Sequence, residues 1–172
     1  MKHYDVELER LEARYARGIG ERRQAWNYRR GNHDAHGLEG AGYQAGLALH
    51  ELGALAELAV AKAWALDWTP VWTELDPARP DVGNLHVRGT THPHGCLPIR
   101  RRDLRHAAEA PFVLVVELEP DRRYRIAGWL RARAGEWFGW NRSPGGRPAA
   151  YFVPQPKLRP YWTCPVRDEA AP

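Results

Sequence analysis

Apolar residues recur along the chain with two different spacings. Between residues 4 and 30 they return every three or four positions in a highly charged stretch, which predicts one or two helices, broken or kinked near Gly18 and Gly20. Residues 47–66 are rich in Ala and Leu and apolar on most faces, so we expect a buried helix there. From residue 71 onward, short apolar runs between Pro and Gly residues predict strands instead.

The strongest strand prediction falls on residues 112–116, which are apolar without interruption, as in a central strand buried on both faces. A polar turn at Asp121 makes residues 112–129 a predicted hairpin. Shorter strands are expected at residues 71–75, 81–90, 96–100 and 150–154, and a short helix at 101–110. This order of elements predicts an α/β domain with a mixed β-sheet and no repeated strand–helix–strand unit.

The composition fits a single soluble domain. With 172 residues, 44% of them apolar, the chain can bury a core without disulfides or metals. No apolar run reaches the roughly 18 residues of a membrane span, and the acidic, amphipathic start lacks a signal-peptide core. Cys96 and Cys164 are too few for a disulfide framework, so we expect a cytoplasmic protein without a membrane partner.

Arginine carries almost all of the positive charge. The formal net charge is +4, and only Lys2, Lys62 and Lys157 are lysines. Guanidinium groups bind phosphate through two parallel hydrogen bonds, so this bias is compatible with a nucleic-acid partner. A GC-rich genome, which encodes arginine in place of lysine, explains the same bias without any function.

The most specific local pattern runs from Asp81 to Arg88. Strand alternation places His86 and Arg88 on one face and turns Val87 toward a core. A tight turn at residues 83–84 can bring Asp81 beside His86. The pattern therefore predicts an acid, an imidazole and a guanidinium at one end of a sheet.

A second candidate is Glu57, which lies within the most apolar helix of the chain. A buried carboxylate is costly unless it is paired or binds a metal, which makes Glu57 a candidate functional acid. Two plainer interpretations stay open: an ion pair with Lys62 or with an arginine, and a side chain that faces water.

Several segments follow one another in a characteristic order. They are GALAELAVAKAW from residue 53, DVGNLHVRGT from 81, LPIRRRD from 97, FVLVVEL from 112, YRIAGWL from 124 and AYFVPQPKL from 150. This order resembles the PD-(D/E)xK nuclease superfamily, and more narrowly a group of uncharacterised phage and prophage proteins assigned to it. The resemblance implies a restriction-endonuclease-like core over residues 47–160, with a mixed β-sheet flanked by helices. Residues 1–46 would be an N-terminal helical extension, and residues 161–172 an irregular tail.

The resemblance also implies a role for each candidate residue. Glu57 would be the helix-borne acid that helps to hold a divalent ion, and Asp81 the carboxylate that binds it directly. His86 lies where the family has an acidic second ligand, and Arg88 where it has a lysine, while Val87 would offer its carbonyl to the ion. The implied chemistry is Mg²⁺- or Mn²⁺-assisted hydrolysis of phosphodiester bonds in DNA, with RNA as the alternative substrate.

Two positions depart from the family pattern. His86 offers a neutral nitrogen where Mg²⁺ prefers oxygen, and imidazole suits Mn²⁺, Fe²⁺ or Zn²⁺ better. Arg88 can stabilise negative charge but cannot act as a base. The competing hypothesis is therefore a catalytically degenerate member of the same fold, acting as a nucleic-acid-binding protein or as a phage structural or interaction protein.

The densest basic run is a candidate phosphate-binding surface, formed by Arg100, Arg101, Arg102 and Arg105. The alternative is an exposed helix start whose arginines form weak local ion pairs with Asp103 and Glu109.

Two further groups have both a functional and a structural interpretation. Trp129, Trp137, Phe138 and Trp140, interleaved with Arg131 and Arg133, could stack on unpaired bases or simply pack in the fold. The His-rich segments could bind a transition metal or form polar loops; they contain His92, His94 and Cys96 in one case and His33, Asp34 and His36 in the other.

Overall fold

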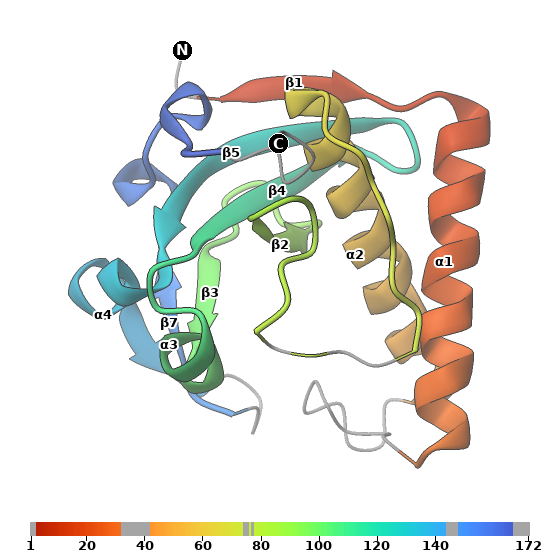
Figure 1. Ribbon diagram of the computed structural model, residues 1–172, viewed down its shortest axis with the longest axis horizontal. Coiled ribbons are helices and arrows are strands. Elements are labelled where there is room, and N and C mark those ends of the chain that lie inside the picture. The colour runs from red at the N-terminus through yellow and green to blue at the C-terminus, as the bar shows by residue number, and fades with distance from the viewer. Residues whose placement is uncertain (1–2, 32–41, 74–75, 77, 144–147, 167–172) are drawn as a thin grey trace, which may run out of the picture.

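A computed structural model of the chain describes residues 3–31, 42–73, 76, 78–143 and 148–166 (Figure 1). It has an α/β fold that combines an N-terminal helical hairpin, a mixed four-stranded sheet and an antiparallel three-stranded sheet. The predicted cluster of His33, Asp34 and His36 lies outside the described residues. Among the helices within these ranges, none combines the length and apolar character needed to cross a membrane.

The strands form two separate sheets. The first has the order β1 (Tyr4–Glu7), β5 (Arg123–Arg131), β4 (Pro111–Glu119) and β2 (His86–Thr90), and only β2 and β4 run parallel. The second is antiparallel throughout and has the order β3 (Leu97–Arg100), β7 (Ala150–Val153) and β6 (Trp140–Arg142).

The helices differ widely in length. They are α1 (Arg10–Arg29), α2 (Gly42–Trp64), α3 (Arg101–His106) and α4 (Gly135–Phe138), and short 3-10 turns span Ala132–Ala134, Gln155–Lys157 and Tyr161–Thr163. The long helices α1 and α2 lie side by side along one face of the first sheet, whereas α3 and α4 accompany the second sheet (Figure 1).

Strand β4 lies at the centre of the core, and its side chains alternate between two apolar clusters. Val113 and Val115 belong to a cluster with residues of α1 and α2, which we call the helix-side cluster. Phe112, Leu114 and Val116 pack on the opposite face with residues of the second sheet. This double burial explains the uninterrupted apolar run in the sequence, and it confirms that β4 is buried on both faces.

The prediction of a mixed sheet with helices is confirmed at the level of the α/β class, but the layers differ in detail. Helices cover one face of the first sheet. The second sheet covers the other face, and its strands are too short to be predicted as a layer. The N-terminal segment is part of the core, because β1 is an edge strand of the first sheet and α1 packs on α2. Tyr161 and Cys164 also pack against the helix-side cluster.

Three local predictions are wrong. Residues Tyr4–Glu7, expected to be helical, form strand β1. Helix α1 is not broken at Gly18 or Gly20, and Gly20 lies where α1 crosses α2, where it leaves room for the backbone of that helix. The described part of residues 71–75 is not a strand, since the Val71 carbonyl accepts a hydrogen bond of 2.7 Å from the Arg23 Nε instead of joining a sheet.

We expect Gly20→Ala to destabilise the protein by about 1–3 kcal/mol, as overpacking of a tight contact does. A Cβ atom at Gly20 would lie 2.6 Å from the Glu51 backbone, which cannot move without separating the helices. Gly18 has open space around it, so Gly18→Ala should stabilise the same helix by up to about 1 kcal/mol. Urea denaturation of the two variants measures both effects, and equal stabilities would contradict the close crossing.

A buried histidine makes the helix pair sensitive to acid. The His50 Nε2 lies 3.0 Å from the Asn27 side-chain amide, and burial lowers the pKa of His50 to about 4. Between pH 6.5 and pH 4 the unfolded chain therefore binds a proton that the folded protein does not, so stability decreases as the pH falls through this range. We expect His50 to contribute a loss of up to about 3 kcal/mol, measured by urea denaturation at several pH values. His50→Gln should lose that part of the pH dependence, and an unchanged slope would contradict the assignment.

Candidate functional site

A tight turn brings Asp81 to the open edge of the first sheet. The Asp81 amide donates to the Leu85 carbonyl at 2.8 Å, and Gly83 supplies the positive φ of 51° that the turn requires. The chain then enters β2, and the Val87 amide donates a hydrogen bond of 2.7 Å to the Asp81 Oδ2. The turn expected at residues 83–84 thus places Asp81 beside the first residues of β2.

Strand β2 presents its side chains to both layers of the core. Val87 packs with the helix-side cluster, as its alternation with His86 and Arg88 predicts. His86 and Arg88 turn to the opposite face, where both contact the Phe112 ring. Asp81 lies at the strand edge, between the two faces.

The Arg88 guanidinium connects Asp81 with a second, deeply buried acid. Its Nη1 donates to the Val87 carbonyl at 3.0 Å and lies 3.8 Å from the Asp81 Oδ2. Its Nη2 donates to the Asp103 Oδ1 at 3.1 Å. The Arg88 Nε is buried without a hydrogen-bond partner among the described residues.

Asp103 is a site residue that the sequence treats only as a local ion-pair partner. Asp103 is only 1% exposed, and its Oδ2 accepts a hydrogen bond of 2.9 Å from the Arg100 amide at the start of α3. An acidic residue three positions into a helix often caps it, so the sequence contains the signal for this bond. The contact of Asp103 with Arg88 depends on the tertiary fold and has no comparable signal.

Glu57 is buried on α2 and held by an arginine of α1. The Arg23 Nη1 and Nη2 donate to its two carboxylate oxygens at 2.6 and 2.9 Å, and the Trp68 indole donates to one of them at 3.2 Å. Of the alternatives open in the sequence, the arginine ion pair is therefore the one observed. Lys62 pairs with Glu12 instead, at 2.7 Å.

The Glu57–Arg23 pair is electrostatically coupled to Asp81. Burial raises the pKa of Glu57, the hydrogen bond from Arg23 opposes this rise, and the negative charge of Asp81 reinforces it. Glu57 and Asp81 therefore lie close enough to sense each other, although Glu57 stays on the helix side of the sheet.

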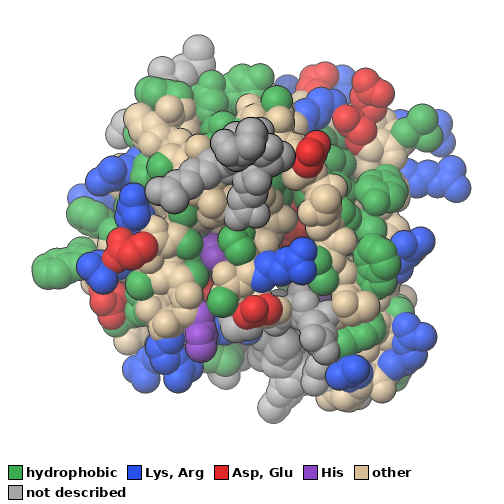
Figure 2. All heavy atoms as spheres, in the orientation of Figure 1, with side chains coloured by type: hydrophobic (Ala, Val, Ile, Leu, Met, Phe, Trp, Pro, Cys, Tyr) green, Lys and Arg blue, Asp and Glu red, His purple; other side chains and the backbone are tan. Residues whose placement is uncertain are grey.

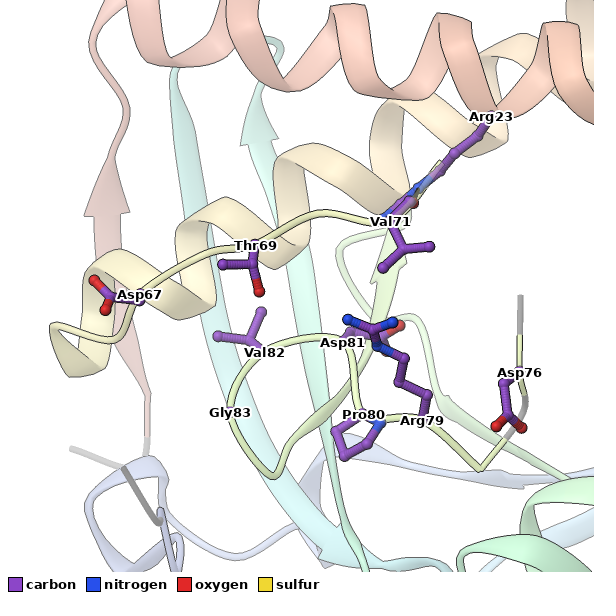
Figure 3. A pocket seen from close by; sticks show the side chains of 10 residues that line it. All are labelled: Arg23, Asp67, Thr69, Val71, Asp76, Arg79, Pro80, Asp81, Val82 and Gly83. Atoms are coloured by element: carbon purple, nitrogen blue, oxygen red, sulfur yellow. Dashed lines mark hydrogen bonds between the residues drawn. The ribbon is translucent and has the colours of Figure 1, made fainter. Parts of the chain in front are cut away.

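A small pocket opens next to this edge of the sheet. Its volume is about 120 Å³, and its lining includes Arg23, Val71, Asp76, Arg79 and Asp81. In Figure 3, Arg23 extends from α1 past α2 toward Val71, and Asp81 and Arg79 lie together on the loop below. Asp81 is thus accessible from the pocket, and none of the described residues forms a hydrogen bond with its Oδ1.

His86 lies deeper, with only 3% of its surface exposed. Its ring stacks on Phe112 with centroids 4.5 Å apart, and its Nε2 is buried without a hydrogen-bond partner among the described residues. Burial lowers the pKa of His86, an effect that Asp81 and Asp103 oppose and Arg88 reinforces. The imidazole is therefore neutral near pH 7, which leaves one ring nitrogen able to accept a hydrogen bond or a metal ion.

The structure brings Asp81 and Arg88 together and places His86 and Glu57 on opposite faces of β2. Within the described ranges, no group of three or more His, Cys, Asp or Glu side chains is arranged to hold a metal ion. Among the predicted site residues, the Asp81 Oδ1 and the His86 Nε2 have no hydrogen-bond partner within the described ranges, whereas both Glu57 oxygens accept hydrogen bonds. The carboxylates of Asp67 and Asp76 also line the pocket beside Asp81.

The second metal candidate in the sequence forms an exposed turn. The rings of His92 and His94 lie 6.2 Å apart, and the His94 amide donates to the His92 Nδ1 at 3.1 Å. Together with Cys96 they form no metal-binding group in the part of the chain that the structure describes. The segment is therefore a polar loop, as the alternative interpretation of the sequence expected.

The basic run forms the start and the exposed side of α3. Arg101, Arg102 and Arg105 are exposed, and Arg100 directly precedes the helix. Arg102 approaches Asp103 only at 4.0 Å, and Glu109 pairs with Arg131 and Arg133 instead of with this run. In Figure 2, Lys and Arg side chains gather at the lower left, over the position of α3 in Figure 1.

No known protein family, curated protein sequence or solved structure matches this chain.

Proposed function

We propose that this chain hydrolyses phosphodiester bonds of DNA with the help of a divalent metal ion bound next to Asp81. The observation that supports this most directly is the pair of unsatisfied buried atoms, His86 Nε2 and Arg88 Nε, in the residues that flank Val87. Buried polar atoms are nearly always hydrogen-bonded, so these two indicate a place where a polar ligand belongs. The Arg88 Nε is a donor and would bind an anionic oxygen such as that of a phosphate, while the neutral His86 nitrogen could bind the metal ion.

The charge of the cluster also favours a cation. Among the described residues, Glu57 is paired with Arg23, whereas Asp81 and Asp103 share the guanidinium of Arg88. Arg79 also lies at the pocket, but its side chain is exposed, so solvent screens its charge. A cation bound beside Asp81 would add to this shared and partly screened counter-charge.

The donors that remain available fit an ion that takes few ligands from the protein. Mg²⁺ is commonly held by one or two carboxylates, with water and substrate phosphate completing its coordination, and imidazole also suits Mn²⁺. We assign the Asp81 Oδ1 as the anchoring ligand and the His86 Nε2 as the second. A bound ion supplies a water of lowered pKa and neutralises charge on the phosphate.

The other residues of the site position these groups. Val87 fixes the Asp81 carboxylate through its amide, and Asp103 holds the Arg88 guanidinium where it can stabilise negative charge on a phosphate. Glu57 acts with Arg23 to support the wall of the pocket instead of binding the ion. The exposed arginines of α3 would contact the backbone of the nucleic acid.

The proposal is tested by measuring thermal stability and cleavage in parallel. Mg²⁺ or Mn²⁺ should raise the melting temperature, and the same ion should support cutting of single- or double-stranded DNA, or of RNA, which EDTA should abolish. Lys157→Ala, a change at an exposed position outside the site, should behave like the wild type. If neither Mg²⁺ nor Mn²⁺ stabilised the protein or supported cleavage, the proposal would be contradicted.

One observation favours a second function, the binding of nucleic acid without cleavage. The Arg88 guanidinium already occupies the space between the Val87 carbonyl and Asp81, where it supplies a permanent positive charge. Salt-dependent DNA binding that is unaffected by EDTA, together with an absence of cutting, would support this function.

A further inference from the structure

The second sheet has one face toward the core and one face toward solvent. Leu97, Ile99 and Val153 are fully buried against β4. Side chains alternate along a strand, so Pro98 and Arg100 lie on the other side of β3, which we call the outer face.

The strand register extends the outer face across all three strands. Pro98 pairs with Phe152, which pairs with Trp140, and this forms one row across the sheet. The next row places Arg100 opposite Ala150 and Ala150 opposite Arg142. Directly paired residues share a face, so the outer face carries a row with two aromatic rings beside a row with two arginines.

The outer face is most accessible at β6 and carries positive charge, whereas Phe152 is half-buried and Ala150 is buried. Trp140 is 55% exposed, and the Arg142 guanidinium lies 5.6 Å from the centre of its ring. The residues of β3, β6 and β7 include two arginines and no Asp or Glu. Trp137 and Phe138, at the end of α4 and one residue before β6, are exposed as well, at 80% and 47%. Of the aromatic residues singled out in the sequence, only Trp129 is buried in the core.

We propose that the outer face binds a single strand of nucleic acid, with bases stacked on Trp140 and Phe152 and phosphates bound by Arg142 and Arg100. The exposed Trp140 ring and the half-buried Phe152 ring beside arginines suit unpaired bases, because every base offers a face for stacking whatever its sequence. A duplex keeps its bases stacked internally and could use only the arginines.

The outer face is also connected to the proposed catalytic site. Arg100 ends the arginine row, its amide bonds to Asp103 on α3, and Asp103 binds Arg88. This chain of bonds links the arginine row to Arg88 through the buried Asp103. This inference rests on the proposed function for its choice of nucleic acid, and it adds the form of the strand and the place where it binds.

The test measures binding of a fluorescent oligothymidylate of about 15 nucleotides in EDTA, where no metal-dependent cleavage occurs. Trp140→Ala should weaken binding roughly 5- to 100-fold, and Trp140→Phe should restore most of it. Arg142→Ala should weaken binding and reduce the slope of log affinity against log salt by about 0.7.

Trp162 provides the matched control. It is also 55% exposed, but it belongs to the turn whose Tyr161 packs on the helix-side core. Trp162→Ala should bind the oligonucleotide like the wild type. The inference would be overturned if Trp140→Ala bound the oligonucleotide as tightly as the wild type, or if the wild type bound a duplex of the same length equally well. In that case a protein partner would be the alternative ligand of the outer face.

The two proposals fail separately. Binding in EDTA that depends on Trp140, without cleavage in any metal, would support single-strand binding at the outer face and contradict the proposed nuclease activity. Metal-dependent cleavage that does not change in Trp140→Ala would do the reverse.

Discussion

Replacing Arg23 by Met should lower the free energy of unfolding by about 3–5 kcal/mol. The substitution removes both strong hydrogen bonds to Glu57 and leaves a carboxylate buried in an apolar helix interface. It also removes the Arg23 bond to the Val71 carbonyl, which anchors the loop of the pocket. Urea denaturation followed by circular dichroism measures the loss.

Two comparisons separate the buried charge from the simple loss of a contact. In Arg23→Met combined with Glu57→Met, no unpaired charge remains, so the double variant should regain most of the stability. Lys62→Met breaks the half-exposed pair with Glu12 and should cost less than about 1 kcal/mol. A double variant no more stable than Arg23→Met would show that the charge of Glu57 is not the cause.

Changing Asp81 to Asn should reduce metal-dependent cleavage about a thousandfold or more. A bound metal ion contributes several kcal/mol to the transition state, and each 1.36 kcal/mol corresponds to a factor of ten in rate. An amide oxygen at this position can still accept the bond from the Val87 amide, so the turn should stay intact while the anchoring charge is lost. The increase in melting temperature with Mn²⁺ or Mg²⁺ should disappear in the same variant.

Asp5→Asn serves as the control for this experiment. Asp5 lies on β1, at the opposite edge of the same sheet, and pairs with Arg125. The same change of acid to amide there should leave both the cleavage rate and the metal-induced stabilisation unaltered. If Asp81→Asn retained both, the assignment of Asp81 as the metal ligand would be wrong.

The sequence predicts the elements whose pattern follows from their own burial. The apolar run at residues 112–116 and the Ala- and Leu-rich helix around Glu57 are both observed, because each is buried on nearly all sides. Strand β1 is not predicted, because only one of its four residues, Val6, is buried. The charged residues around Val6 continue the helical pattern. Gly20 suggests a helix break in the sequence, and only the position of α2 explains why it does not cause one.

The sequence predicts the local geometry of the candidate site, but not the contacts between residues that are far apart in the chain. The alternation of His86, Val87 and Arg88 follows from strand geometry, and the turn that brings Asp81 to them follows from the glycine at residue 83. The partner of Glu57 could not be predicted, because Arg23 lies 34 positions away among many similar arginines. Which guanidinium reaches which acid depends on how α1 and α2 cross.

The contacts of Val87 have a further consequence for the first sheet. Strand β2 is an edge strand, and its outward amide and carbonyl at Val87 are bonded to the side chains of Asp81 and Arg88. A strand from another molecule would need these same two groups to join the sheet. The side chains proposed for chemistry therefore also cap this part of the sheet edge, so we expect substitution of Ala for both to increase aggregation, measured by light scattering, as well as to abolish the proposed cleavage.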